Sequence, residues 1–201
     1  MDSLERENKE FFDRFAAYYD RSALKKWLIS IQKKALWEIN FWKNSRILEV
    51  GCGTGDLLLF LSEQKKSFKL YGVDISGEML KIARRRLLNT RVRLKLEPAE
   101  RIRFRKGYFD YVLSIDAFHH YYNYESVMKN FCRVLRKNGR LVVIDVDFGF
   151  ILNKIFHAIE PGNNKMFNAG EFRRLFEQYN LKGIKQKRIG LFSLLTTGEK
   201  N

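Results

Sequence analysis

The sequence has few cysteines, few prolines and no long apolar run. Its two cysteines, Cys52 and Cys132, form no C-x-x-C pair, which excludes a disulfide framework and argues against redox chemistry and structural zinc. Two prolines and 14% aromatic residues argue against disorder. The longest apolar run is 57–61, whereas a membrane-spanning helix needs about 18 residues. The opening residues are charged and no apolar segment follows them, so we expect no secretory signal and a cytoplasmic protein.

The length of 201 residues is enough for one α/β domain with a buried core and leaves little room for a second. We expect a helical leader or lid over residues 1–43 and the main domain over 44–201. Residues 11–42 have the apolar spacing of two amphipathic helices, which we expect to cap the open end of a sheet. The leader's aromatic residues are expected to pack in a core rather than to form a binding stripe; they are Phe11, Phe12, Phe15 and Trp27.

Basic residues are present in excess and are unevenly placed. The 38 Lys+Arg against 23 Asp+Glu give a formal net charge of +15. Segment 81–107 alone holds eleven basic and two acidic residues. Such a segment attracts polyanions, either nucleic acid or an anionic membrane surface. It shows no interleaved aromatic ladder for stacking bases, so a solvated helix and strand surface is the competing interpretation.

A strand–helix–strand pattern follows the leader. Residues 46–50 and 69–73 are short apolar runs, and residues 56–64 between them carry an apolar helical face. Such a unit requires a parallel sheet. The pattern continues with helices expected at 77–88, 125–135 and 169–179 and strands at 92–96, 109–115 and 140–146, the last after a turn at Asn138-Gly139. Runs 184–188 and 192–197 predict a final antiparallel hairpin.

Three glycines follow the first predicted strand, in the segment 51–55 (GCGTG). Glycines there let the backbone turn sharply and let a ligand approach main-chain atoms. A dinucleotide fingerprint would need glycine where Asp56 stands, and the preceding Glu49 would repel a pyrophosphate. Asp74 ends the second strand, where a carboxylate can accept hydrogen bonds from ribose hydroxyls. The pattern favours a nucleoside-type cofactor without phosphate, and a structural glycine turn is the alternative.

Ordered motifs carry a resemblance to a known family. They are EVGCGTG at 49–55, GVDIS at 72–76, FDYV at 109–112 with AFHH at 117–120, and RVLRKNGRL at 133–141, preceded by FDRFAAYYD at 12–20. Together they resemble the class I S-adenosylmethionine-dependent methyltransferases, in particular the ubiquinone and menaquinone biosynthesis C-methyltransferases. The resemblance covers most of the chain. It implies an α/β fold with a Rossmann-like, doubly wound, seven-stranded sheet, mostly parallel with an antiparallel C-terminal hairpin and flanked by helices.

The resemblance also implies a site for S-adenosylmethionine, with S-adenosylhomocysteine as product. Glu49 would hold the ammonium of the cofactor, Asp74 its ribose and Ile75 its adenine. The remaining implied cofactor-binding residues are Tyr19 at the carboxylate end, Gly51, Cys52, Gly53 and Gly55 in the glycine loop, Ala99 and Glu100 at the adenine edge, and Ser114 and Ile115 through backbone carbonyls. At the adenine edge the chain departs from the family pattern, because Glu97-Pro98 replaces the usual Gly-Asp and a proline has no N–H to donate.

In methyl transfer from a sulfonium, the protein mainly aligns the acceptor and excludes water, and a general base is needed only where the acceptor must lose a proton. The candidate catalytic residues are Asp116 and His119. The candidate substrate residues are His120, Tyr121, Phe148 and His157, and the leader and residues 147–168 are the expected substrate lids. For the histidines, simple packing or contact with the cofactor is the alternative, and for the aromatic residues, covering the sheet edge. No metal site is expected.

The leading hypothesis is an S-adenosylmethionine-dependent methyltransferase with a small or medium-sized acceptor. One alternative is an RNA methyltransferase that uses segment 81–107, although residues 114–117 (SIDA) lack the Asn/Asp-Pro-Pro-Tyr/Phe signature of base-amino methyltransferases. A second alternative is a regulatory module that binds the cofactor without catalysis. The sequence identifies neither the acceptor nor the oligomeric state.

Overall fold

Seven strands form one sheet in the computed structural model, which describes residues 3–147, 165–190 and 192–201. Their spatial order is β3-β2-β1-β4-β5-β7-β6. Strands β1 to β5 are parallel, and β7 runs antiparallel to both β5 and β6. The mostly parallel sheet with a C-terminal antiparallel hairpin is therefore confirmed. The strands are β1 (Arg46–Val50), β2 (Lys69–Asp74), β3 (Arg93–Leu96), β4 (Phe109–Ile115), β5 (Leu135–Val146), β6 (Leu181–Ile189) and β7 (Ser193–Lys200).

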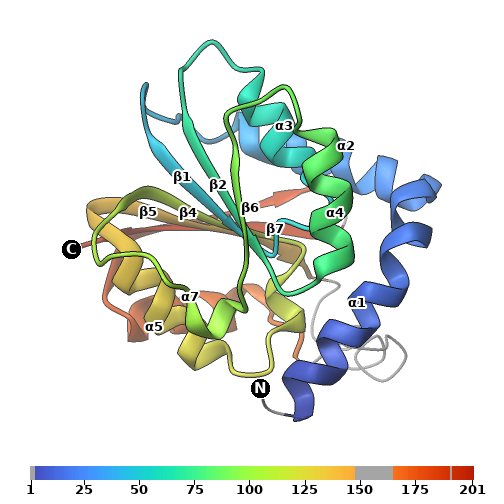
Figure 1. The fold of residues 1–201 in the computed structure, drawn as a ribbon. Coiled ribbons are helices and arrows are strands. Elements are labelled where there is room, and N and C mark those ends of the chain that lie inside the picture. The colour runs from blue at the N-terminus through green and yellow to red at the C-terminus, as the bar shows by residue number, and fades with distance from the viewer. Residues whose placement is uncertain (1–2, 148–164, 191) are drawn as a thin grey trace.

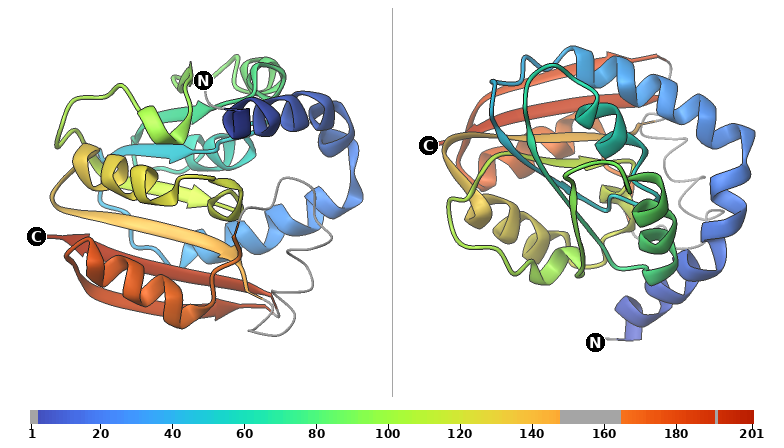
Figure 2. Two further views of the ribbon diagram at one scale, coloured as in Figure 1. Left: turned by 90° about the horizontal axis from the view of Figure 1, so that it is seen from below. Right: turned by 45° about the horizontal axis from the view of Figure 1, so that its top comes forward.

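Helices cover both faces of this sheet (Figures 1 and 2). One face carries α3 (Asp56–Ser62), α4 (Gly77–Arg86) and the end of α2 (Ala23–Trp37), and the other carries α5 (Tyr124–Val134) and α7 (Ala169–Gln178). Among the described residues, no helix is long and apolar enough to cross a membrane.

Each face of the sheet has its own apolar core because successive strand residues point to opposite sides. On β5, Val143 belongs to the core beneath α5 and α7, whereas its neighbour Ile144 belongs to the core beneath α2 and α3. Helix α5 buries Val127, Phe131 and Val134, a spacing that places them on one helical face. Both cores are therefore built from sequence-local periodicity.

The strand order reverses between β1 and β4, because the chain builds β2 and β3 outward before it returns to β4. Val50, the last residue of β1, is in register with Val73 of β2 on one side and Ser114 of β4 on the other. Connections leave the sheet in opposite directions at such a point and open a crevice at the carboxyl ends of the strands. The glycine loop 51–55 follows β1 into this crevice.

Strand β5 differs from the expectation of a turn at Asn138-Gly139 followed by a strand from residue 140. The strand already begins at Leu135, and the expected turn lies inside it as a bulge. The partners on β4 shift across this bulge from Phe109 to Tyr111, and Asn138 has φ 59°. A residue with positive φ fits a bulge as well as a loop. Asn138-Gly139 therefore marks the positive φ correctly, but the pair does not distinguish a bulge within a strand from a turn before one.

The leader forms α1 (Ser3–Arg21) and α2, joined at Ser22, whose hydroxyl accepts a hydrogen bond of 3.0 Å from the Lys25 N–H. Helix α1 begins at residue 3 rather than 11, because its charged opening consists mostly of good helix formers. Helix α1 contacts α4, and α2 contacts α3 (Figure 2). The end of α2 buries Ala35 and Leu36 in the core, so this part of the leader is an integral layer of the fold.

Candidate cofactor and acceptor site

The glycine loop turns from β1 into α3 with left-handed backbone conformations. Gly51 has φ 73° and Gly53 has φ 50°, a region that residues with a side chain rarely adopt. A Cβ on Gly51 would lie 2.6 Å from the Cβ of Ala117, so glycine allows the loop to pack against the end of β4. A Cβ on Gly53 would have no atom of the described residues within 4 Å. The main chain at Gly53 therefore faces open space.

That space is a cavity of about 850 Å³ at the carboxyl ends of the strands, a size typical of ligand pockets. Its walls come from the ends of β1, β2 and β4, from the loops that follow them, and from the leader helices. The predicted site residues that line it are Tyr19, Glu49, Gly51, Cys52, Gly53, Asp74, Ile75, Ala99, Glu100, Ile115, Asp116, His119, His120 and Tyr121. One cavity thus gathers residues from five separate segments of the sequence.

Two predicted site residues do not line the cavity, and two others lie outside the described residues. A Cβ on Gly55 would lie 2.9 Å from Leu87, so this glycine allows close packing of the loop against α4 instead of contact with a ligand. Ser114 is fully buried within β4, where its hydroxyl is 3.2 Å from that of Tyr121. Phe148 and His157 fall in the segment 148–164, which the structure does not describe.

Glu49 is an unusual buried acid at the end of β1. Glu49 is 3% exposed. Among the described residues, its Oε2 has no hydrogen-bond partner. Burial, followed by the carboxylates of Asp56 and Asp74, raises the pKa of Glu49 well above its usual value. An unsatisfied buried carboxyl oxygen costs folding free energy. A cationic group placed in the cavity would offset that cost.

Asp74 ends β2 on the opposite side of the glycine loop. Its Oδ2 accepts a hydrogen bond of 2.7 Å from the Gly53 N–H, and its Oδ1 accepts one of 2.8 Å from the Ser76 N–H. Burial outweighs these hydrogen bonds and raises the pKa of Asp74 to about 6. Each carboxylate oxygen can accept more than one hydrogen bond. Asp74 is therefore held rigidly and retains capacity for two hydroxyls of a ligand.

The wall beyond Asp74 is partly apolar. Ile75 contributes from the β2–α4 connection and Met79 from the first turn of α4. Ala99 and Glu100 come from a short 3₁₀ helix, η1 (Ala99–Arg101), after β3. The helix starts directly after Pro98, whose missing N–H costs no helical hydrogen bond at that position. Burial raises the pKa of Glu100 to about 7, so near neutrality its carboxyl can donate as well as accept a hydrogen bond.

His119 is buried in a second 3₁₀ helix, η2 (Phe118–His120), and is held by Asp145 of β5. The Asp145 Oδ1 lies 2.5 Å from the His119 Nδ1, and the Asp145 Oδ2 accepts a 3.0 Å hydrogen bond from the His119 backbone N–H. This pairing orients the ring and favours the tautomer in which Nδ1 carries the proton and donates it in a hydrogen bond to Asp145. Sequence reasoning missed Asp145, although an acid within the apolar run of β5 was a visible signal.

Asp116 begins the segment after β4 with φ 45°, an uncommon conformation for a residue other than glycine. The Gln32 side-chain amide of α2 donates a hydrogen bond to its Oδ2. The neighbouring His120 ring lies 3.9 Å from the His119 ring and 4.9 Å from the Phe12 ring, between centroids. The leader thus contacts the segment after β4 at two points, through Gln32 at Asp116 and through Phe12 at His120.

The aromatic face of α1 also lines the cavity, which corrects the expectation that these residues form only a packing core. Phe11, Phe12 and Phe15 are part-buried and point to the same space as Tyr19. The centroids of the Phe11 and Phe15 rings are 5.5 Å apart. The helical spacing of these residues was visible in the sequence, but only the tertiary position of α1 shows that their face meets a cavity. The Trp27 side chain lies outside the described part of the structure.

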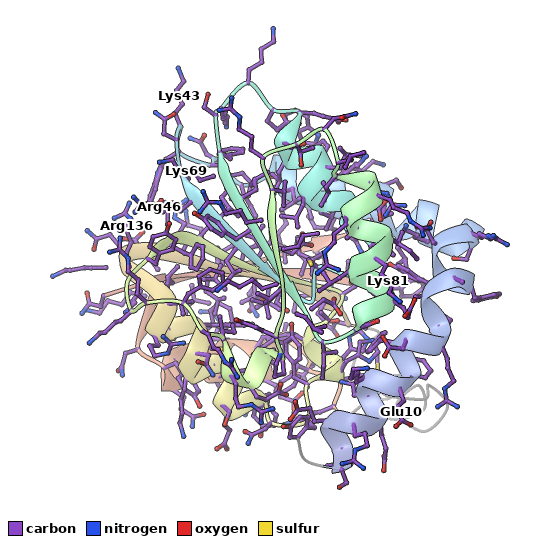
Figure 3. All side chains as sticks on the ribbon, in the orientation of Figure 1. Glu10, Lys43, Arg46, Lys69, Lys81 and Arg136 are labelled. Carbon is purple, nitrogen blue, oxygen red and sulfur yellow. The ribbon has the colours of Figure 1, made fainter. Side chains whose placement is uncertain are left out.

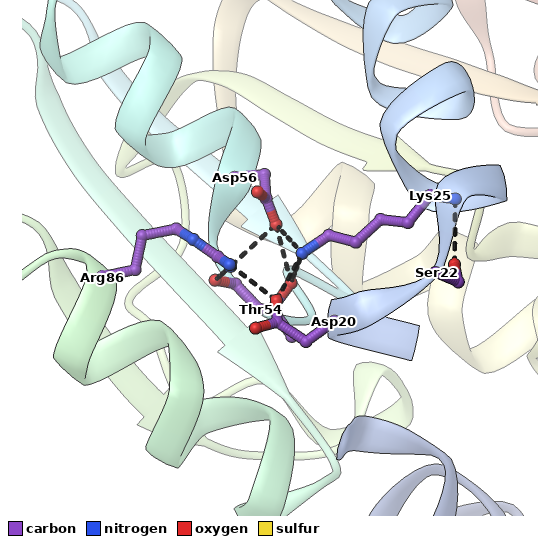
Figure 4. Close-up of polar contacts among 6 residues, drawn as sticks. All are labelled: Asp20, Ser22, Lys25, Thr54, Asp56 and Arg86. Atoms are coloured by element: carbon purple, nitrogen blue, oxygen red, sulfur yellow. Dashed lines mark hydrogen bonds and ion pairs between the residues drawn. The ribbon is translucent and has the colours of Figure 1, made fainter. Parts of the chain in front are cut away.

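A network of charges fastens the leader to the glycine loop (Figure 4). The Lys25 ammonium lies 2.6 Å from Asp20 Oδ1 and 2.7 Å from Asp56 Oδ2, and donates a 2.9 Å hydrogen bond to the Thr54 hydroxyl. Arg86, at the end of α4, bridges the same two carboxylates at 2.6 and 2.8 Å. Residues from α1, α2, α3 and α4 therefore meet beside the cavity in one cluster.

These residues fit the cofactor implied by the resemblance. The Glu49 oxygen, which has no hydrogen-bond partner in the described part of the chain, suits an ammonium. The bare backbone at Gly53 leaves room for an amino-acid chain, and Asp74 suits ribose hydroxyls. Acidic residues around the cavity also suit a sulfonium cation. The candidate site contains no cluster of metal-ligating side chains among the described residues.

Comparison with known proteins supports the same family. A model of the methyltransferase domain matches residues 47–139. The demethylmenaquinone methyltransferase of Thermus thermophilus is 34% identical over 142 residues, which cover 66% of this chain and 64% of that protein. The ubiquinone/menaquinone biosynthesis C-methyltransferase of Geotalea uraniireducens is 30% identical over 147 residues, which cover 68% and 62%. The chain spans a little under two thirds of the length of these two relatives.

Solved structures share the fold at lower sequence identity. A chain from the complex between a Haloferax volcanii methyltransferase activator and a methyltransferase superposes with a TM-score of 0.80 at 17% identity, covering 94% of this chain and 96% of that one. An S-adenosylmethionine-dependent methyltransferase from Thermotoga maritima gives a TM-score of 0.78 at 22% identity, covering 96% and 100%. The matched domain and the relatives therefore support a class I S-adenosylmethionine-dependent methyltransferase that resembles the ubiquinone and menaquinone biosynthesis C-methyltransferases, and the solved structures show that the chain shares the fold.

Proposed function

We propose that this protein transfers a methyl group from S-adenosylmethionine to a small, largely apolar acceptor of the quinol type. One observation carries the proposal. The buried Glu49 oxygen without a hydrogen-bond partner among the described residues faces the same cavity as the glycine loop and Asp74. A cationic amino-acid end and a ribose would satisfy these groups together. When bound, the cofactor supplies an electrophilic methyl group, and the protein supplies alignment.

The acceptor class is inferred from the leader and from the relatives. Phe11, Phe12 and Phe15 give the cavity an aromatic wall without charges of its own, which suits an apolar ring. The two relatives are named for demethylmenaquinone methylation and for ubiquinone/menaquinone biosynthesis. A quinol fits both observations.

A quinol must lose a hydroxyl proton before its ring carbon becomes a strong nucleophile, so a general base has a role. We assign that role to His119, whose ring is oriented by Asp145 and borders the cavity. Asp116 lies on the same rim and is positioned by Gln32. We propose that Asp116 positions the acceptor or takes up the proton with His119.

Water must be kept from the reacting atoms, and the leader is placed to do this. We propose that residues 1–43 act as a lid whose aromatic face closes over the acceptor. The charge cluster around Lys25 supports this role, because it ties the α1–α2 junction to the glycine loop.

Calorimetry with S-adenosylhomocysteine tests the cofactor part of the proposal. Binding to the unaltered protein is expected in the micromolar range and at least tenfold weaker for Asp74→Ala, since one lost charged hydrogen bond corresponds to about 1.4 kcal/mol or more. Glu78→Ala is the matched control, because Glu78 is an exposed carboxylate on α4 that pairs with Lys81. Absence of binding, or equal binding by Asp74→Ala, would overturn the assignment of this site.

Transfer of a labelled methyl group tests the acceptor part. A reduced, short-chain demethylmenaquinone should accept the label, and the corresponding menaquinol, already methylated, should not. His119→Ala should lower the rate while cofactor binding stays within a few-fold. Label entering RNA of a cell extract but not the quinol would favour the RNA methyltransferase alternative. Cofactor binding without transfer to any acceptor would favour the non-catalytic alternative.

A further inference from the structure

A second cavity, of about 320 Å³, lies at the β2–β3 edge of the sheet and shares no lining residue with the first. We call it the basic groove. Four of its seven lining residues are cationic and the other three are aromatic. They are Arg93, Lys95, Arg103 and Arg105, with Tyr71, Phe104 and Tyr108.

The basic groove exists because the β3–β4 connection, residues 97–108, contains only the short helix η1. A full helix in this crossover would cover the adjacent part of the sheet. Here Phe104 and Tyr108 pack against the α5-side core instead and leave the edge strand open beside them. Arg93 and Lys95 stand two residues apart on β3 and therefore point to the same side.

The cations of the basic groove lie on its aromatic rings. The Lys95 ammonium is 4.1 Å from the Phe104 ring centroid, and the Arg105 guanidinium is 4.8 Å from that of Tyr108. The Arg46 guanidinium, from the start of β1, lies at the same 4.8 Å from the Tyr108 ring. The Phe104 and Tyr108 rings are nearly parallel, at 4°, with centroids 6.4 Å apart. Guanidinium planes and parallel rings together form a stacking surface for another flat group.

The charge of the basic groove is only partly neutralised. Glu97 lies 3.7 Å from Lys95 and accepts a hydrogen bond of 2.9 Å from the Arg103 backbone N–H. Arg93 and Arg105 have no ion pair of 4 Å or less among the described residues.

The pKa of the Tyr108 phenol is lowered, first by its 2.9 Å hydrogen bond with Tyr71 and then by nearby arginines.

Further cations surround this end of the molecule. Lys43, Arg46, Lys69 and Arg136 lie on one side, away from Lys81 and Glu10 (Figure 3). Arg136 is paired with Asp110. The excess positive charge of segment 81–107 is therefore divided. Arg84 and Arg85 are exposed on α4, and Arg86 is turned into the charge cluster around Lys25. Lys81 and Arg101 pair with acidic residues. Four others line the basic groove, namely Arg93, Lys95, Arg103 and Arg105.

We propose that the basic groove binds single-stranded nucleic acid, with phosphates on its arginines and a base stacked on the Phe104–Tyr108 surface. Cations without aromatic rings would suit any polyanion, whereas this combination is the one that unpaired nucleotides use. The four cationic residues are exposed, whereas Phe104 and Tyr108 are part-buried, so a flat bilayer would meet the charges before the rings. The proposal stands on the basic groove alone and is independent of the acceptor assigned above.

Fluorescence anisotropy with a labelled 15-nucleotide single-stranded RNA of mixed sequence tests this site on the full chain. We expect Arg93→Glu/Arg105→Glu to weaken binding at least tenfold at low salt. Its log–log salt slope should also be shallower by about 1.4, because two phosphate contacts are lost. Arg84→Glu/Arg85→Glu is the matched control, since it changes the net charge equally on exposed α4 and should cost less than threefold.

A second variant separates stacking from charge. Phe104→Leu keeps every cation and should weaken binding of the single strand several-fold while leaving the affinity for inorganic polyphosphate unchanged. Far-ultraviolet circular dichroism and a single thermal transition confirm that each variant is folded. The proposal would be overturned by absent RNA binding, by equal losses in both arginine pairs, or by an unchanged Phe104→Leu. Preference for vesicles containing anionic phospholipid over the RNA would assign the basic groove to a membrane instead.

Discussion

The Lys25 ammonium lies 2.7 Å from Oδ2 of Asp56, which joins the start of α2 to the first turn of α3 directly after the glycine loop. The Lys25 side chain is 4% exposed, so the ion pair is shielded on the lysine side. Asp56 also stands where a dinucleotide-binding loop would have its third glycine. The departure from that fingerprint therefore has a structural use, since the carboxylate anchors the leader.

Lys25→Met should destabilise the protein and weaken cofactor binding together. The variant leaves Asp20 and Asp56 facing one another with only Arg86 between them. Removing one member of a buried ion pair costs about 3–5 kcal/mol, and the partial exposure of both carboxylates reduces this to about 1–3 kcal/mol. Urea unfolding and calorimetry with S-adenosylhomocysteine measure the two effects.

Lys34→Met is the control for this change, because Lys34 is exposed on the same helix. It should alter the free energy of unfolding by less than about 0.5 kcal/mol. Equal stability of Lys25→Met and Lys34→Met would show that the cluster does not hold the leader in place.

Gly72→Ala should be strongly destabilising although the residue lies in a strand. A Cβ there would be 2.6 Å from Leu58 Cδ1 and 2.8 Å from Cys52 Sγ, so α3 and the glycine loop would have to shift. Overpacking of this kind costs about 1–3 kcal/mol. Gly77→Ala is the control, because a Cβ at the start of α4 has nothing within 4 Å. A smaller loss for Gly72→Ala than for Gly77→Ala in urea unfolding would contradict this packing.

Most of the fold was predictable because its signals are local. The apolar run 46–50, the glycines after it and the helical face of 56–64 define a βαβ unit without reference to the rest of the chain. The bulge at Asn138 was not predictable, since its positive φ is shared by turns and bulges. The choice between them depends on the pairing of Phe109 with Leu135.

The candidate site was predictable only where a motif marks it. Glu49 lies next to the last residue of β1 and Asp74 ends β2, both beside a glycine loop, so their positions followed from parallel topology. The cavity-facing role of Phe15 did not follow, because helical spacing identifies a face and not its partner. Tyr71 and Arg93 meet only through the register of β2 and β3, so the basic groove was invisible as a site in the sequence.

Glu100→Gln should stabilise the protein at alkaline but not at acidic pH. The pKa of Glu100 is raised from 4.5 to about 7 by burial. An acid with a raised folded pKa contributes stability that is fully present below pH 4.5 and lost as the pH rises through about 7. Glutamine removes this loss, so we expect a gain of about 1–2 kcal/mol at pH 8 and almost none near pH 4.5.

Urea unfolding of both proteins at several pH values measures this difference, and Glu78→Gln provides a control at an exposed carboxylate of α4. Because the comparison is made between two proteins, the titration of Asp74 cancels. A gain at pH 4.5 as large as at pH 8 would show that the charge of Glu100 is not its source.

Asp145→Asn should release His119 from a single tautomer. Asp145 is 1% exposed and accepts hydrogen bonds from the His119 ring, the His119 N–H and the Val146 N–H. Asparagine has one side-chain acceptor oxygen in place of two. Long-range ¹H–¹⁵N correlation spectra should show His119 as the Nδ1–H tautomer in the unaltered protein and as a mixture in the variant. His120, whose ring packs against Phe12, provides the internal control.

If His119 is the general base, methyl transfer should fall at least tenfold in the variant while binding of S-adenosylhomocysteine changes little. Retention of both the tautomer and the rate would show that Asp145 has only a structural role.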